Sequence, residues 1–123
     1  MDYVYFFDTY ALVEIVKGNP KYVKFKYCKV VLTIFNLFEL HYKLLRDFDK
    51  KIADKVLDEY SSAVISVDTI SVKEASEFRL LHRRKDLSAA DVIGYTCARK
   101  YGVKFLTGDE SEELDRRVDG FLA

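Results

Sequence analysis

Four carboxylates stand in stretches of sequence that otherwise resemble a protein core. Asp8 ends an aromatic run, Glu39 interrupts an apolar segment, and Asp91 and Asp109 each follow a short stretch of apolar and small residues. A charge in such surroundings is costly unless it is paired or bound to a cation. Because carboxylate oxygens suit hard divalent ions, we expect Mg²⁺ or Mn²⁺ to bind if the four acids converge.

Three of these acids also have an ordinary interpretation as helix caps. Asp8 directly precedes a helical pattern, which suits an N-cap residue. Ser88 with Asp91 forms a capping-box pattern, and Asp109 with Glu112, three residues later, is also compatible with a cap. Taken one at a time, these acids need no ligand, so only their joint occurrence indicates a site.

Glu39 is the least expected of the four. Its ordinary interpretation is an ion pair with Lys43, which lies one helical turn later. The surrounding Phe35, Phe38 and Tyr42 instead predict a helix with little exposed face. A carboxylate on such a helix favours a bound cation.

Composition limits the classes of protein that this chain can belong to. Its 123 residues are enough for one domain with a substantial core, and we expect a single domain over residues 1–123. Half of the residues are hydrophobic and 15% are aromatic, which excludes a disordered chain. Twenty basic and twenty acidic side chains give a formal net charge of zero, so any surface for nucleic acid must be a local patch.

Two further features concern the compartment. Cys28 and Cys97 lie far apart without a Cys-x-x-Cys motif, so we expect reduced thiols in the core rather than a disulfide or a zinc site. The N-terminus lacks a basic n-region, and no apolar run approaches the roughly 20 residues that span a bilayer. These features predict a cytoplasmic protein.

Strand-like apolar runs alternate with helical patterns along the chain. The runs at 3–7, 30–33, 64–67 and 104–107 are nearly continuous, which is typical of strands buried on both faces of a parallel sheet. Helices are predicted over 9–17, 34–46, 50–60, 71–83 and 88–101, with a short helix at 112–117 and a last strand at 118–122. The helix at 71–83 is assigned from a capping-box pattern of Ser71 with Glu74.

This alternation predicts the α/β class. We expect a three-layer α/β/α arrangement around a central, mainly parallel sheet of about five strands, joined by right-handed crossovers. In such sheets, sites form outside the carboxyl ends of the strands. Asp8 and Asp109 occupy that position after two different strands.

Four segments of the chain resemble PIN-domain ribonucleases in order and spacing. Segment 5–14 (Tyr-Phe-Phe-Asp-Thr-Tyr-Ala-Leu-Val-Glu) resembles their opening strand and helix, and segment 33–40, ending Phe-Glu-Leu, resembles their helix with a single glutamate. Segment 87–98 resembles their third acidic motif, and segment 103–109 their closing strand with Thr-x-Asp. The resemblance is greatest to the toxin subunits of VapBC-type toxin–antitoxin pairs. The family usually has an aromatic residue three positions after the last Asp, where this chain has Glu112, so whether Glu110 or Glu112 assists Asp109 stays open.

The resemblance implies a metal-dependent endoribonuclease. Asp8, Glu39, Asp91 and Asp109 would then hold one or two Mg²⁺ or Mn²⁺ ions, which activate water and stabilise charge on the scissile phosphate. Two hydroxyls beside the acids could orient a carboxylate or a water, although β-branched residues are also common at strand edges. These hydroxyls belong to Thr9 and Thr107.

RNA also needs positive charge near the site, because phosphate contacts dominate affinity. The only dense basic cluster before an acidic motif consists of Arg83, Arg84 and Lys85, and Arg99 lies two turns after Asp91 on the same predicted helix. The alternative is a solvated helix end, where basic residues favour the helix dipole. His41 and His82 are not in metal-ligand spacing, so we expect surface or interface roles for them.

By analogy with VapBC toxins, an antitoxin would cover the acidic site with an extended tail, and the chain would form a homodimer. The apolar helix surface over 34–45 and 50–60 is a candidate for both contacts, and core packing is its alternative interpretation. A PIN-like module that binds RNA or protein without cutting is the main rival function. A receiver domain using Asp8 and Asp68, or a haloacid-dehalogenase-type phosphatase, leaves Glu39 unexplained, and the latter needs an acid where Tyr10 stands.

Overall fold

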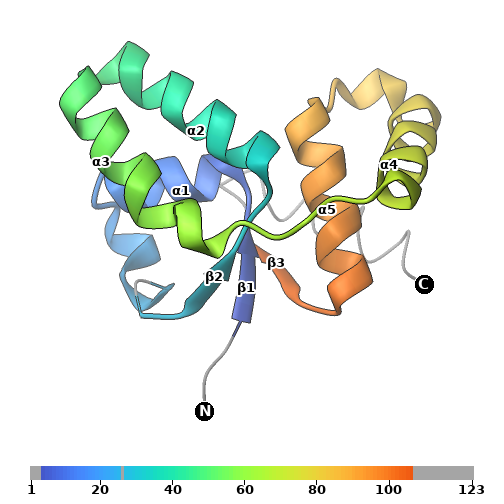
Figure 1. The fold of residues 1–123 in the computed structure, drawn as a ribbon, viewed down its shortest axis with the longest axis horizontal. Coiled ribbons are helices and arrows are strands. Elements are labelled where there is room, and N and C mark those ends of the chain that lie inside the picture. Colours follow the sequence, from blue (N-terminus) through green and yellow to red (C-terminus); the bar gives the residue numbers. More distant parts are fainter. Residues whose placement is uncertain (1–3, 26, 107–123) are drawn as a thin grey trace.

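The computed structural model describes residues 4–25 and 27–106, in which strands and helices alternate (Figure 1). The elements in chain order are β1 (Val4–Phe7), α1 (Thr9–Val16), η1 (Pro20–Phe25), β2 (Lys29–Val31), α2 (Ile34–Asp47), α3 (Lys50–Tyr60), η2 (Ser61–Ala63), α4 (Thr69–Leu81), η3 (Arg83–Lys85), α5 (Ala89–Tyr101) and β3 (Lys104–Leu106). The three η elements are short 3₁₀ helices.

The strands form a parallel sheet in the order β2-β1-β3. In its centre, Phe6 of β1 stands opposite Val31 of β2 and Phe105 of β3. Because β1 is the middle strand, the residue that follows it lies between the ends of its two neighbours. That residue is Asp8.

Side chains on the two faces of β1 enter two separate cores. Phe7 packs with α1, α2 and α3, whereas Phe6 packs with α4 and α5. This division follows from the alternation of side chains along a strand. Figure 1 shows α1, α2 and α3 on one side of the sheet and α4 and α5 on the other. Helices therefore cover both faces, and the α/β class with a parallel sheet is confirmed.

The sheet is smaller than predicted: the described residues form three strands, not about five. The prediction of a strand at 64–67 was wrong, because only one parallel bridge, between Leu32 and Val64, extends the sheet beyond β2. The chain then turns away, and Asp68 caps the next helix. Thr33 is not a strand residue either, since it caps α2. The predicted helix at 112–117 and strand at 118–122 lie outside the described residues.

Helix ends follow their caps. The capping box of Ser88 with Asp91 at the start of α5 is confirmed, as is the end of this helix at Gly102, which has a φ of 65°. The predicted box of Ser71 with Glu74 was wrong. Asp68 caps α4 three residues earlier by accepting a hydrogen bond from the backbone N–H of Ser71 at 2.8 Å.

Both cysteines are free thiols, as predicted. Cys97 is buried in the core beside α5, and burial raises the pKa of its thiol, which makes it a poor nucleophile. Cys28 is only partly buried, so the prediction of a core position is confirmed for Cys97 and was wrong for Cys28. In the part of the chain that the structure describes, none of the helices has the length and apolar character to cross a bilayer.

Candidate active site

Asp8 lies at the carboxyl end of the central strand and is 3% exposed. Its backbone N–H donates to the carbonyl of Leu106 at 3.0 Å, which holds it beside the end of β3. Its Oδ1 accepts a hydrogen bond from the backbone N–H of Ala11 at 2.8 Å, so the predicted N-cap role is confirmed. The cap therefore uses Oδ1 of the carboxylate.

Glu39 is half-buried on α2, which begins at the carboxyl end of β2. It forms no ion pair with Lys43, so this ordinary interpretation of Glu39 was wrong. The expectation that its neighbours are buried was also wrong. Phe38 is 70% exposed and Tyr42 is 55% exposed, because α2 turns only the face with Asn36, Leu37, Leu40 and Leu44 into the protein.

Asp91 lies in the first turn of α5 and is half-buried. Its Oδ2 accepts a hydrogen bond from the backbone N–H of Ser88 at 2.9 Å. Since α5 leads directly into β3, this helix runs opposite to the parallel strands. Its first turn is therefore at the carboxyl edge of the sheet, the edge at which Asp8 lies (Figure 1).

Three residues bring β1, α2 and α5 into close contact, and we call them the junction: Phe6, Asn36 and Gly94. A Cβ added at Gly94 would stand 2.7 Å from Cε1 of Phe6 and 3.2 Å from Oδ1 of Asn36. The first distance is shorter than carbon atoms tolerate. Only glycine therefore allows α5 to approach the other two elements this closely.

Each of the three acids lies two or three residues from a residue of the junction. Asp8 comes two residues after the junction residue of β1, on the same face of the strand. Glu39 comes three residues after the junction residue of α2, and Asp91 three residues before that of α5. Because α2 and α5 both begin at the carboxyl edge, Glu39 in the second turn of α2 and Asp91 in the first turn of α5 lie near the edge at which Asp8 stands. The three acids therefore lie near one edge of the sheet.

The described residues alone do not complete a metal site. Among them, no three His, Cys, Asp or Glu side chains form a group that could hold an ion. The fourth predicted ligand, Asp109, and the predicted hydroxyl of Thr107 lie outside the described residues. The assignment of all four acids as ligands therefore stays a prediction.

The chemistry around Asp8 nevertheless fits a hydrated divalent ion. Thr9, the first residue of α1, is 6% exposed, and its Oγ1 has no hydrogen-bond partner in the described part of the chain. A buried hydroxyl without a partner is unfavourable by about 1–3 kcal/mol. An ion-bound water or a reoriented carboxylate would supply that partner. Hard carboxylate oxygens with a neighbouring hydroxyl are the donors that Mg²⁺ or Mn²⁺ favours.

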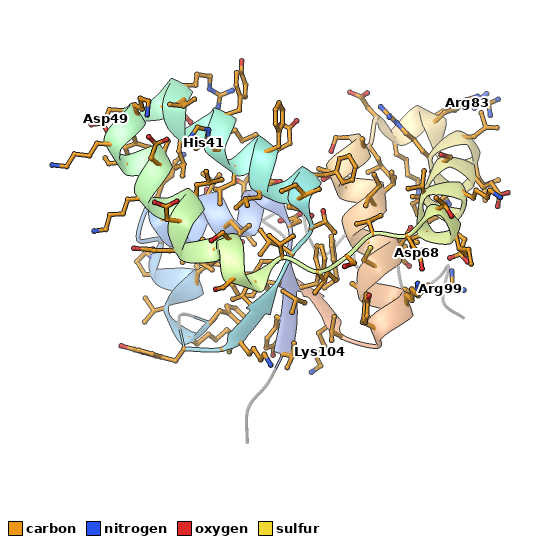
Figure 2. All side chains as sticks on the ribbon, in the orientation of Figure 1. His41, Asp49, Asp68, Arg83, Arg99 and Lys104 are labelled. Carbon is orange, nitrogen blue, oxygen red and sulfur yellow. The ribbon has the colours of Figure 1, made fainter. Side chains whose placement is uncertain are left out.

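The predicted basic residues are divided between two places. Arg83, Arg84 and Lys85 are exposed in η3 and line a cavity of about 360 Å³ near the end of α4. Arg99 lies eight residues after Asp91, which is about 12 Å along the helix axis. It lines a separate groove between α4 and α5, and Figure 2 shows it far from Arg83. All four RNA contacts stay predictions.

The two histidines contact residues outside this edge. Nε2 of His41 lies 2.8 Å from Oδ1 of Asp54, and Lys50 donates to the other oxygen of the same carboxylate. The hydrogen bonds from Lys50 and His41 lower the pKa of Asp54. His82 packs against the ring of Phe78 at 4.4 Å. The contact of His41 thus joins α2 to α3, and His82 packs against the last turn of α4.

Comparison with known proteins identifies the family. The sequence profile of the PIN domain matches residues 5–117. The chain belongs to the PIN-domain family. The fold of this PIN domain is similar to that of Mycobacterium tuberculosis VapC20, described as a toxin that cleaves the sarcin–ricin loop, with a TM-score of 0.72 and 18% sequence identity over 86% of this chain and 90% of that one.

A second similar structure is that of VapBC2 from Rickettsia felis, solved bound to a DNA fragment from their promoter. Its TM-score is 0.68, with 18% identity over 91% of this PIN domain and 92% of the other chain. At this identity, both structures establish the fold alone. No curated protein sequence matches the chain.

Two residues of this edge were not predicted from the sequence, Asn36 and Gly94. Glycine inside a helix is unfavourable by about 1 kcal/mol relative to alanine, so its presence in the helix at 88–101 was a usable signal of a close contact. Asn36 stands in the apolar run before Glu39, where an amide needs partners. Neither signal indicates by itself which element makes the contact.

Proposed function

We propose that this PIN domain is a metal-dependent endoribonuclease that hydrolyses phosphodiester bonds in RNA, and that it is the toxin of a toxin–antitoxin pair. The observation that carries the proposal is the position of Asp8, Glu39 and Asp91 near the carboxyl edge of the sheet, each two or three residues from a residue of the junction. Membership of the PIN-domain family and the similarity of fold to VapC20, described as a toxin that cleaves the sarcin–ricin loop, support it.

In this proposal, Asp8, Glu39, Asp91 and Asp109 hold Mg²⁺ or Mn²⁺. A bound ion lowers the pKa of its water and stabilises charge on the phosphate. The caps of α1 and α5 each use one carboxylate oxygen, Oδ1 of Asp8 and Oδ2 of Asp91, and so restrict the rotamers of the two side chains. The hydroxyl of Thr9, which has no partner among the described residues, would donate a hydrogen bond to an ion-bound water or to a reoriented carboxylate. The Arg83–Lys85 turn supplies positive charge for the RNA backbone.

The proposed partner is an antitoxin protein, and a homodimer is proposed as well. The exposed side chains of α2 form an apolar strip that a partner can cover. It consists of Phe35, Phe38, Tyr42 and Leu45. The similarity to VapBC2, which was solved as a complex, supports an antitoxin. A cytoplasmic location belongs to the same proposal.

The test is cleavage of a structured RNA by the purified protein with Mg²⁺ or Mn²⁺, with and without EDTA. Asp8→Asn is the informative variant, because asparagine caps a helix about as well as aspartate but binds cations poorly. Asp49→Asn is its matched control. Asp49 caps α3 by accepting a hydrogen bond from the backbone N–H of Ile52 at 2.8 Å, the same geometry as the cap of α1.

We expect cleavage that EDTA abolishes, that Asp8→Asn and Asp91→Asn abolish, and that Asp49→Asn leaves intact. Circular dichroism checks that every variant is folded. Cleavage that persists in EDTA, or full activity in Asp8→Asn, contradicts the proposed mechanism. RNA binding without cleavage, by a wild-type protein that is folded and loaded with metal, supports the rival function of a non-cleaving PIN-like module.

A further inference from the structure

A buried amide at the junction lacks a hydrogen-bond partner. Asn36 is fully buried. Its Oδ1 accepts two hydrogen bonds from Thr33, one from the backbone N–H at 3.2 Å and one from the side-chain hydroxyl at 2.6 Å. Its Nδ2 has no partner in the described part of the chain. Leaving such a donor unpaired in the interior is unfavourable by about 1–3 kcal/mol. A group that raises the free energy of the folded state in this way calls for an explanation.

Helix capping does not explain the amide. The task of residue 36 in the cap of α2 is to accept hydrogen bonds from Thr33, which requires only an oxygen. In α5 the same task is done by a carboxylate, that of Asp91, in the box with Ser88. Asn36 therefore carries an N–H₂ group that its cap does not use.

The position of the amide explains it better. Asn36 lies at the junction, one helical turn before Glu39 and against Gly94, which is one turn after Asp91. A carboxylate at this position would add another negative charge to the acids and raise their repulsion. An amide keeps the oxygen that the cap needs and adds a neutral donor one helical turn from Glu39.

We propose that Asn36 is a positioning residue of the acidic site: its Nδ2 donates a hydrogen bond to a carboxylate oxygen when a divalent ion draws the acids together. The inference rests on the proposed function and deepens it by naming what orients the ligands. Asn36 is fully buried and does not contact RNA. Groups that orient metal ligands typically change metal affinity by 10- to 100-fold when they are removed.

The wild-type protein allows a direct test. The chain has two asparagines, Asn19 and Asn36, and no glutamine, so a ¹H–¹⁵N spectrum contains only two side-chain amide pairs. Nδ2 of Asn19 donates to Glu14 at 2.8 Å, near the end of α1 that lies away from the acids, and serves as an internal control. The spectrum of Asn19→Ala assigns the two pairs.

On addition of Mg²⁺ we expect one Asn36 amide proton to move downfield and to exchange more slowly with water, while the Asn19 pair stays in place. Movement of both pairs together, or of neither at saturating Mg²⁺, overturns the inference. This measurement needs no substitution at residue 36, so misfolding of a variant does not obscure it.

A pair of variants then separates positioning from capping. Asn36→Ala removes the amide, whereas Thr33→Val removes the hydroxyl of the cap and leaves the amide in place. We expect both to lower the melting temperature in EDTA, but only Asn36→Ala to weaken Mn²⁺ binding, by tenfold or more. Titration followed by electron paramagnetic resonance measures this affinity. Equal Mn²⁺ affinities in the two variants overturn the inference.

The two proposals fail in different ways. If the wild-type protein binds no Mn²⁺ and its ¹H–¹⁵N spectrum does not change on addition of Mg²⁺, the proposed function fails, and the inference about Asn36 fails with it. If the wild-type protein binds Mn²⁺ and cleaves RNA while Asn36→Ala does so equally well, only the inference fails.

Discussion

Substitution of Gly94 by alanine tests whether the junction sets the position of the acids. The new Cβ would stand 2.7 Å from Cε1 and 2.9 Å from Cζ of Phe6. The Phe6 ring is fully buried and stacks on Phe105 at 5.6 Å between ring centres, so it has little room to yield. Restoring an ordinary carbon–carbon contact of about 3.5 Å requires α5 to move by about 0.8 Å.

The substitution is expected to lower two measured quantities, the free energy of unfolding and the rate of cleavage. Alanine favours the helix by about 1 kcal/mol relative to glycine, while overpacking costs about 1–3 kcal/mol, so we expect a net loss of about 0–2 kcal/mol in the free energy of unfolding. The displacement also carries Asp91 away from Asp8 and Glu39. A shift near 1 Å at an active site can lower the rate about 100-fold. We therefore expect cleavage to fall by one to two orders of magnitude.

Gly102→Ala is the matched control on the same helix. A Cβ there meets no atom within 4 Å, but the φ of 65° makes alanine unfavourable by roughly 1–2 kcal/mol. It destabilises the fold at the end of α5 that is far from Asp91. Urea unfolding and RNA cleavage are measured for both variants. Cleavage by Gly94→Ala that equals cleavage by Gly102→Ala refutes the role of the junction.

Four further outcomes are expected. Asp8→Ala should lower the free energy of unfolding in urea by about 1 kcal/mol relative to Asp8→Asn, because only asparagine retains the cap. In EDTA, Asp91→Asn should raise the melting temperature if the acids repel one another, and an unchanged or lower value favours a capping role alone. The hydrogen bond from Lys100 and those from Ser71 lower the pKa of Asp68 to about 2, from an ordinary value of 3.8. The resulting stabilisation is complete above about pH 4 and is lost as the pH falls towards 2. Because Lys100→Met removes the largest of these causes, the melting temperature of this variant should depend less on pH in this window. Phe38→Asp should leave the fold and RNA cleavage intact but shift a homodimer towards monomer in analytical ultracentrifugation, and an unchanged dimer rules out the α2 strip as its interface.

Local signals predicted most of the helices within one or two residues. Ser88, Asp91 and Gly102 fix both ends of α5, and their hydrogen bonds involve only neighbours in the chain. The same is true of Asp8 at the start of α1. The carboxyl edge of the sheet follows from the alternation of strands and helices, so the region of the site was predictable as well.

Features that depend on distant partners were not predictable. Val64, Ile65 and Val67 are apolar and pack against the two cores, yet only Val64 forms a bridge to the sheet. The run of apolar residues therefore indicates burial but does not indicate pairing with another strand. Likewise, the sequence alone does not tell whether an apolar residue such as Phe38 lies in the core or on the surface.

The two interpretations of the acids, caps and metal ligands, are compatible because they use different oxygens. Oδ1 of Asp8 caps α1 and Oδ2 of Asp91 caps α5, and each carboxylate has a second oxygen. A cap holds its side chain in one rotamer, so it reduces the conformational entropy that ligand binding would otherwise remove. Of the three proposed ligands that the structure describes, only Glu39 has no cap to restrict its side chain. The amide of Asn36 lies one helical turn before it. Glu39 is therefore the ligand, among these three, that most needs a positioning residue.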